Sequence, residues 1–252
     1  MKFKKKLVII TGGTKGIGYA ISQEFLKNNW KVIITGRSET LKIKKNKNRN
    51  LKYLKMDVTK EKDFIRLYKE AIKWSKNINC VINCAGISSW MPIGSVNNNF
   101  IDKIFETNVK GVIWSCKHAS QYLKSGSSII NISSIASKRG SKNNSIYCAS
   151  KFAVNGITQS LSRELGEKNI RVNGVCPVNI LTEGLKDAFK SNYSPVNNNT
   201  QFYLKEFTKQ QSALSKLPTK EDIANFCYFL ASDKARYITG QSFNIDSGVM
   251  PT

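Results

Sequence analysis

A short apolar run followed at once by a glycine-rich turn constrains the fold of this chain more than any other feature. Residues 7–10 are Leu, Val, Ile and Ile, a continuous run typical of a strand buried on both faces of a parallel sheet. The turn at 11–18 follows, and residues 19–28 then carry apolar side chains at helical spacing. Glycines let the backbone approach a pyrophosphate, and the start of the helix offers unpaired N–H groups. This order therefore predicts a phosphate-binding loop of a dinucleotide site.

The residues after the second apolar run indicate which dinucleotide is bound. Residues 31–35 form this run, and Gly36 and Arg37 follow it. NAD-binding proteins place an acidic residue near this point, on the ribose 2′-hydroxyl. Arg37 and, in the glycine turn, Lys15 are cations that suit a 2′-phosphate instead. We therefore expect NADP(H) to be preferred over NAD(H), and the alternative of two surface cations in a lysine-rich chain stays open.

Strand and helix patterns alternate along the rest of the chain. This alternation predicts an α/β fold, a single Rossmann-type doubly wound parallel sheet of about seven strands with helices on both faces. Without a linker or a repeat, residues 1–252 are expected to form one dinucleotide-binding and catalytic domain. Further strands are expected at 51–57, 80–86, 128–132 and 241–246, helices at 60–76 (capped by Thr59), 147–165, 204–215 and 223–231, and an exposed loop at 41–50.

Two residues four positions apart, Tyr147 and Lys151, share one face of a predicted helix. A free tyrosine titrates near pH ~10, and a nearby ammonium favours the phenolate and lowers that pKa. Ser134, after the apolar run at 128–132, is placed to donate a hydrogen bond to a substrate oxygen beside Tyr147. Taken alone, such a pair is more often an ordinary helix surface.

Four motifs in sequence carry a family resemblance. They are T-G-x-x-x-G-x-G at 11–18, N-C-A-G at 83–86, Ser134 thirteen residues before Tyr147, and Tyr147-x-x-x-Lys151. With Asn108, the Asp57-Val58 pair and the segments 173–177 and 237–241, they make the whole chain resemble a short-chain dehydrogenase/reductase, similar to 3-oxoacyl-carrier-protein reductases. Each motif is common alone, whereas all of them in this order are highly specific.

The resemblance implies a reaction and the residues that carry it. It implies hydride transfer between NADP(H) and a carbonyl or secondary alcohol, with Asn108, Ser134, Tyr147 and Lys151 as a catalytic proton relay. Ser134 and Tyr147 would contact the substrate, and Trp90 and Met91 would add apolar contacts or be ordinary loop residues. The implied cofactor contacts are Gly12, Thr14, Lys15, Gly16, Ile17, Gly18, Arg37, Asp57, Val58, Asn83, Ala85, Gly86, Tyr147, Lys151, Pro177, Val178, Ile180 and Thr182.

The chain departs from the family pattern at two positions and in one long segment. Val178 follows Pro177 where the family usually has glycine, which implies a reshaped nicotinamide pocket, and Cys84 replaces a usual alanine. The segment 180–217 is long and polar, and we expect it to form a substrate lid. The family also implies a homo-oligomer, either a dimer or a tetramer.

Composition limits the other classes of function. The net charge of +23 is compatible with nucleic-acid binding, but the lysines are scattered, and we favour a compositional origin with no specific nucleic-acid partner. His118 is the only histidine and the six cysteines lack metal-ligand spacing, so no metal site is expected. No apolar run is long enough to cross a membrane, and the first one is too short for a signal peptide, so we expect a cytoplasmic protein.

Three functions remain after these exclusions. The leading one is NADP(H)-dependent reduction of a small-molecule carbonyl, or the reverse oxidation. The second is 3-oxoacyl-carrier-protein reduction in fatty-acid synthesis, for which a basic surface suits an acidic carrier protein. The third is a catalytically idle cofactor sensor or scaffold of the same fold, which has no need to keep a complete proton relay.

Overall fold

The structure is a computed structural model that describes residues 5–196 and 199–251. In these residues seven strands form one sheet in the order β3-β2-β1-β4-β5-β6-β7, and every neighbouring pair is parallel. The predicted fold class is confirmed. The strands are β1 (Leu7–Thr11), β2 (Lys31–Gly36), β3 (Leu51–Lys55), β4 (Cys80–Asn83), β5 (Ser128–Ile132), β6 (Arg171–Pro177) and β7 (Ser242–Ile245).

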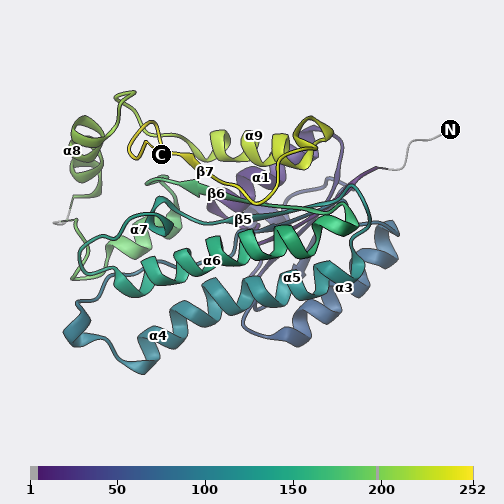
Figure 1. Ribbon diagram of the computed structural model, residues 1–252, viewed down its shortest axis with the longest axis horizontal. Helices are drawn as coiled ribbons and strands as arrows, with labels where there is room; N and C mark the ends of the chain where they lie inside the picture. The colour runs from purple at the N-terminus through teal and green to yellow at the C-terminus, as the bar shows by residue number, and fades with distance from the viewer. Residues whose placement is uncertain (1–4, 197–198, 252) are drawn as a thin grey trace.

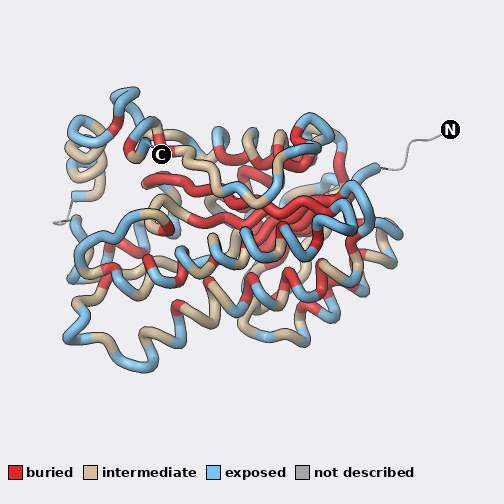
Figure 2. The backbone as a smooth tube through the Cα atoms, viewed as in Figure 1, coloured by how far each residue is buried: buried red, intermediate tan, exposed pale blue. Residues whose placement is uncertain are grey.

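Helices cover both faces of the sheet, as Figure 1 shows. One face carries α1 (Gly16–Lys27) and α9 (Lys220–Ala231), and the other carries α3 (Glu61–Ser75), α5 (Gly111–Tyr122) and α6 (Ser145–Glu164). Strand residues alternate between the two layers: Val8 and Ile10 pack with α1 and α9, whereas Leu7 and Ile9 pack with the opposite helices. The central strands are consequently buried throughout (Figure 2).

The remaining helical elements lie in the connections. They are α2 (Leu41–Lys44), α4 (Asn98–Phe105), α7 (Glu183–Phe189), α8 (Thr200–Gln211), the π-helical turn η2 (Glu106–Lys110), and 3₁₀ turns at Ile93–Ser95, Ile135–Ser137, Gly166–Lys168 and Asp233–Ala235. The turn η2 joins α4 to α5. In Figure 1, α7 and α8 lie at the end of the sheet away from the N-terminus.

Two local expectations were wrong. The segment 41–50 is not wholly an exposed loop, because Leu41–Lys44 form α2 and Ile43 is buried in the core. Thr59 does not cap α3, since Lys60 occupies that position. The Thr59 hydroxyl instead donates to Asp57 Oδ1 at 2.9 Å, and the chain makes a tight turn before the helix begins.

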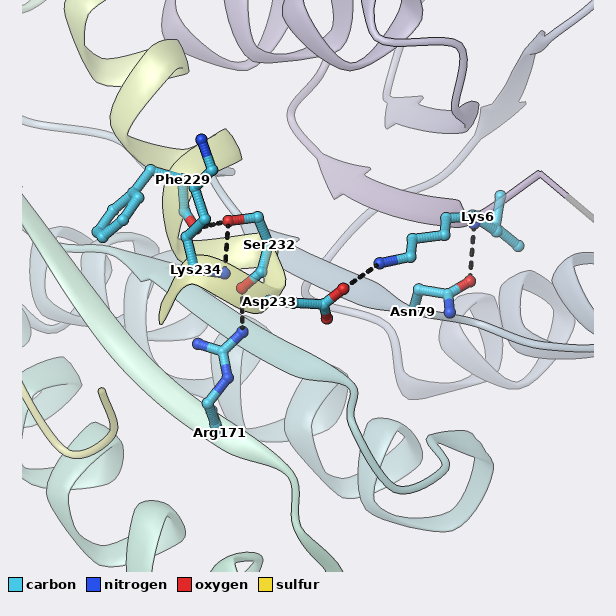
Figure 3. Close-up of polar contacts among 8 residues, drawn as sticks. Lys6, Asn79, Arg171, Phe229, Ser232, Asp233 and Lys234 are labelled. Atoms are coloured by element: carbon cyan, nitrogen blue, oxygen red, sulfur yellow. Dashed lines mark hydrogen bonds and ion pairs between the residues drawn. The ribbon is translucent and has the colours of Figure 1, made fainter. Parts of the chain in front are cut away.

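Polar contacts hold the turn that follows α9 against the amino ends of the strands (Figure 3). The Arg171 guanidinium, at the start of β6, donates to the Ser232 carbonyl at 3.4 Å, and Lys6 pairs with Asp233 at 3.4 Å. Burial of Arg171 lowers the pKa of its guanidinium. These contacts stabilise the amino ends of β1 and β6, opposite to their carboxyl ends.

No helix among the described residues is both long and apolar enough to cross a membrane. The six cysteines are free thiols, five of them buried and Cys84 half-buried, as their apolar surroundings in the sequence indicate.

Candidate active site

The predicted site residues gather at the carboxyl ends of the strands. Thr11 ends β1, Asn83 ends β4 and Pro177 ends β6, while Ser134 stands two residues beyond β5. Ligands of open α/β sheets bind at this edge. The topology therefore brings together segments that are more than 100 residues apart in the sequence.

The glycine turn is packed so closely that side chains would not fit at two of its positions. A Cβ on Gly12, whose φ is +67°, would lie 2.8 Å from Ala85 Cα, and a Cβ on Gly18 would lie 2.4 Å from the Gly12 carbonyl. The Thr11 hydroxyl accepts hydrogen bonds from the backbone N–H groups of Cys84 and Ala85 at 3.1 and 3.2 Å. The turn at 11–18 and the segment 83–86 thus form one bare backbone surface at the start of α1, which fits a pyrophosphate.

Tyr147 and Lys151 share one face of α6, and burial changes the pKa values of both, that of Tyr147 against the expected direction. The Lys151 ammonium lies 5.8 Å from the centre of the Tyr147 ring and donates to the Ile132 carbonyl at 3.0 Å. Burial raises the pKa of Tyr147 to about 12, although a hydrogen bond with Ser134 opposes the change. Burial also lowers the pKa of Lys151 to about 8. The Tyr147 pKa is therefore raised and not lowered as predicted.

Asn108 lies in η2, beside Lys151. Its amide donates to the Ile87 carbonyl at 2.9 Å and accepts from the Ile87 N–H at 2.9 Å. A Cβ on Gly86 would lie 3.3 Å from Asn108 Oδ1 and 3.6 Å from Lys151 Nζ, so only a glycine leaves space between these two groups. No sequence pattern indicated Ser150, whose hydroxyl accepts from the Asn108 amide at 3.1 Å.

The Asn83 side chain bonds within the sheet, and the predicted contact of Asn83 with the cofactor stays a prediction. It is 3% exposed and donates to Asn131 Oδ1 at 2.8 Å, and Asn131 in turn donates to Thr158 at 2.9 Å. This buried network joins β4 and β5 to α6. Ala85 and Gly86, the next residues along the chain, remain at the site edge.

The segment 180–217 packs on the loop that follows β4. The Trp90 ring is 8% exposed and lies 5.4 Å from the Phe189 ring, which contacts the Tyr203 ring at 5.5 Å. Ser191 also donates to the Trp90 carbonyl at 2.8 Å. Trp90 is therefore mainly a support for α7 and α8 rather than an open substrate surface, whereas Met91 is half-buried in the same loop. Residues 197 and 198 lie outside the described residues.

The segment after β6 carries the remaining predicted cofactor contacts. Val178 and Ile180 are 6% and 5% exposed, so the valine that replaces the family's glycine is accommodated inside the protein. Thr182 caps α7 by accepting from the Leu185 N–H at 3.2 Å. A Cβ on Gly16 would lie 3.4 Å from the Thr182 Cβ, so this segment closes against the glycine turn.

The predicted 2′-phosphate contacts lie in the glycine turn and next to it. Arg37 is exposed just after β2, and the adjoining Gly36 has no space for a side chain because its Cβ would lie 2.9 Å from the Thr14 hydroxyl. Lys15 forms an ion pair with Asp187 of α7 at 3.8 Å, which nothing in the sequence pattern indicated. Asp57 accepts from the Thr59 N–H at 3.0 Å, so its carboxylate is engaged within its own loop.

Comparisons with known proteins agree with this geometry. Residues 12–250 match the family model described as enoyl-(acyl carrier protein) reductase. The chain is 33% identical to a 3alpha-hydroxysteroid dehydrogenase of Mediterraneibacter gnavus, over 98% of this chain and 97% of that one. It is 28% identical to an (S)-acetoin-forming diacetyl reductase of Staphylococcus aureus, over 97% of both. The structure of ElxO with NADP bound is similar, with a TM-score of 0.83 and 31% identity over 97% of this chain and 98% of that one.

The fold, the order of the motifs and the relatives all lead to one assignment. The match extends from the glycine turn to the last strand, and the relatives act on alcohol or carbonyl groups. The chain belongs to the short-chain dehydrogenase/reductase family of oxidoreductases.

Proposed function

We propose that this protein is an NADP(H)-dependent oxidoreductase that reduces a small-molecule carbonyl to a secondary alcohol. The observation that carries the proposal is the convergence of Ser134, Tyr147, Lys151 and Asn108 beside a bare glycine turn at the carboxyl edge of the sheet. A sensor or scaffold does not require this complete set of proton-carrying groups.

Each of the four residues has a distinct part in this proposal. Tyr147 donates its hydroxyl proton to the substrate oxygen, and Ser134, which already bonds to Tyr147, holds that oxygen in place. Lys151 binds the nicotinamide ribose and conducts a proton toward Tyr147. Asn108, fixed by Ile87, positions the water that resupplies Lys151.

The residues around the glycine turn fit a dinucleotide cofactor. Gly12, Thr14, Gly16, Ile17 and Gly18 would hold the pyrophosphate, and Arg37 with Lys15 would hold a 2′-phosphate. Backbone groups of Ala85, Gly86, Pro177, Val178 and Ile180, with Thr182, would line the nicotinamide end, and Asp57 with Val58 the adenine end. When bound, the cofactor supplies or accepts the hydride. NADP bound to ElxO supports this choice.

A side-by-side assay tests the proposal. Purified protein is given NADPH or NADH with diacetyl, ketoses, a keto-steroid and an acetoacetyl thioester, and cofactor oxidation is followed. We expect turnover with NADPH and a faster rate than with NADH.

Tyr147→Phe should remove turnover yet bind NADPH normally, whereas Tyr237→Phe, at a side chain that is 88% exposed, should leave turnover unchanged. Activity retained in Tyr147→Phe refutes the proton role.

The acetoacetyl thioester separates the second candidate from the first. The family model is described as enoyl-(acyl carrier protein) reductase, an enzyme that acts on an acyl thioester at its C=C bond, and this supports only the thioester class of substrate for the second candidate. Turnover of the thioester alone would select this function, and turnover of small ketones or sugars alone would exclude it. NADPH binding without any turnover would favour the sensor or scaffold.

We also infer that the protein forms a homo-oligomer through α5 and α6. Ile113 on α5 and Phe152 on α6 expose 43% and 48% of large apolar residues, which a partner subunit would cover. Light scattering on the purified protein tests this inference, and a strictly monomeric mass would refute it.

A further inference from the structure

Lys15 has an anionic partner within the chain in addition to the one expected in the cofactor. Its ammonium lies 3.8 Å from Asp187 Oδ2, and the two side chains are 56% and 57% exposed. Lys15 directly precedes α1 in the glycine turn, and Asp187 lies on α7. An exposed pair of this kind is weak and exchanges readily, so Lys15 is free to turn toward another anion.

The backbone keeps Asp187 at this position. Thr182, which caps α7, approaches Gly16 so closely that a Cβ there would lie 3.4 Å from the Thr182 Cβ. Helix α7 therefore starts against the same turn that carries Lys15. Asp187 follows five residues after the cap, and its carboxylate reaches back to the turn.

Asp187 stays ionised whether or not Lys15 contacts it. Lys190 donates to Asp187 Oδ1 at 2.8 Å, closer than Lys15 approaches. The hydrogen bond from Lys190 is the main cause of the lowered pKa of Asp187, and Lys15 is a minor one. A negative charge therefore persists beside Lys15 at neutral pH.

We propose that Asp187 sets cofactor selectivity by competing with the cofactor's 2′-phosphate for the Lys15 ammonium. The inference rests on the proposed function, in which Lys15 and Arg37 bind that phosphate. NADPH must draw Lys15 away from Asp187 or bind beside both, and either arrangement weakens its binding. NADH carries a hydroxyl at this position and shares the pyrophosphate, so a competition confined to the 2′-phosphate leaves its affinity unchanged.

The substitution Asp187→Asn tests the competition through binding alone. Dissociation constants for NADPH and NADH are measured by quenching of protein fluorescence. We expect the NADPH constant to fall about twofold to fivefold and the NADH constant to stay the same, since an exposed ion pair has a small effect. The change should shrink in 0.5 M salt, where exposed charges are screened. Glu167→Gln, an exposed acid near the opposite edge of the sheet, makes the same change in net charge and serves as the control.

A double-mutant cycle shows whether Lys15 mediates the effect. In a Lys15→Met background, Asp187→Asn should change the NADPH constant no more than Glu167→Gln does. An unchanged NADPH-to-NADH ratio in Asp187→Asn, or an equal gain without Lys15, overturns the inference while leaving the proposed cofactor intact. Failure of the wild-type protein to bind NADPH would overturn both.

Discussion

Lys151 is a buried cation whose removal should make the protein more stable while abolishing its activity. The side chain is 6% exposed, and burial lowers its pKa from 10.5 to about 8. This difference corresponds to about 3 kcal/mol by which the folded state disfavours the charged form. Replacing Lys151 by Met keeps a long apolar side chain and removes that cost.

The gain is partly offset by a lost hydrogen bond. Lys151 donates to the Ile132 carbonyl at 3.0 Å, and leaving this acceptor without its donor costs about 1–2 kcal/mol. We therefore expect Lys151→Met to raise the free energy of unfolding by about 1–2 kcal/mol at pH 7. In a chain of this length that corresponds to a rise in Tm of about 2–6 °C.

The pH dependence provides the sharper test. Between pH 8 and 10.5 the unfolded state binds more protons at Lys151 than the folded state does. The free energy of unfolding of the wild-type protein therefore rises with pH over this range. The advantage of Lys151→Met should therefore be greatest at and below pH 7, fall as the pH rises, and become a deficit of about 1–2 kcal/mol above pH 10.5, where only the lost hydrogen bond remains. Thermal unfolding without cofactor measures it, with Lys168→Met as an exposed control. A variant that is less stable at pH 7, or a difference that persists unchanged to high pH, refutes the reasoning.

Two further substitutions test the glycine turn and the support of α7. Gly12→Ala should raise the NADPH dissociation constant at least about tenfold, because its Cβ would enter the packed backbone. Gly126→Ala, with a similar positive φ but open space, is the control in the same titration, and equal effects would contradict the packing argument. Trp90→Ala should loosen the segment 180–217, raising the KM of the carbonyl substrate several-fold and speeding proteolysis there. Unaltered proteolysis and KM would show that the ring does not support the segment.

The sequence predicted those features that depend on local backbone geometry. Apolar runs ending in glycines predicted β1 and the following turn, because few other residues fit the positive φ and close contact of Gly12. The spacing of Tyr147 and Lys151 placed both on α6, since helical geometry is local. These features need no knowledge of distant contacts.

The contacts that the sequence did not indicate join distant segments. The side chain of Asn83, a predicted cofactor contact, bonds to Asn131, 48 residues away. Trp90 was expected at the substrate or as an ordinary loop residue, and its ring packs on Phe189, which no periodicity joins to it. The Lys15–Asp187 pair likewise requires α7 to return to the first turn. A side chain's type is visible in the sequence, whereas its partner is decided by the packing.

The pKa changes of Tyr147 and Lys151 have a common cause and a consequence for the direction of the reaction. Burial opposes charge on both groups, and the ammonium is turned to the Ile132 carbonyl instead of the phenol. A tyrosine that keeps its proton until about pH 12 is ready to donate to a carbonyl oxygen but must first be deprotonated to accept from an alcohol. Burial therefore favours the neutral phenol, which is the form that the proposed reduction requires.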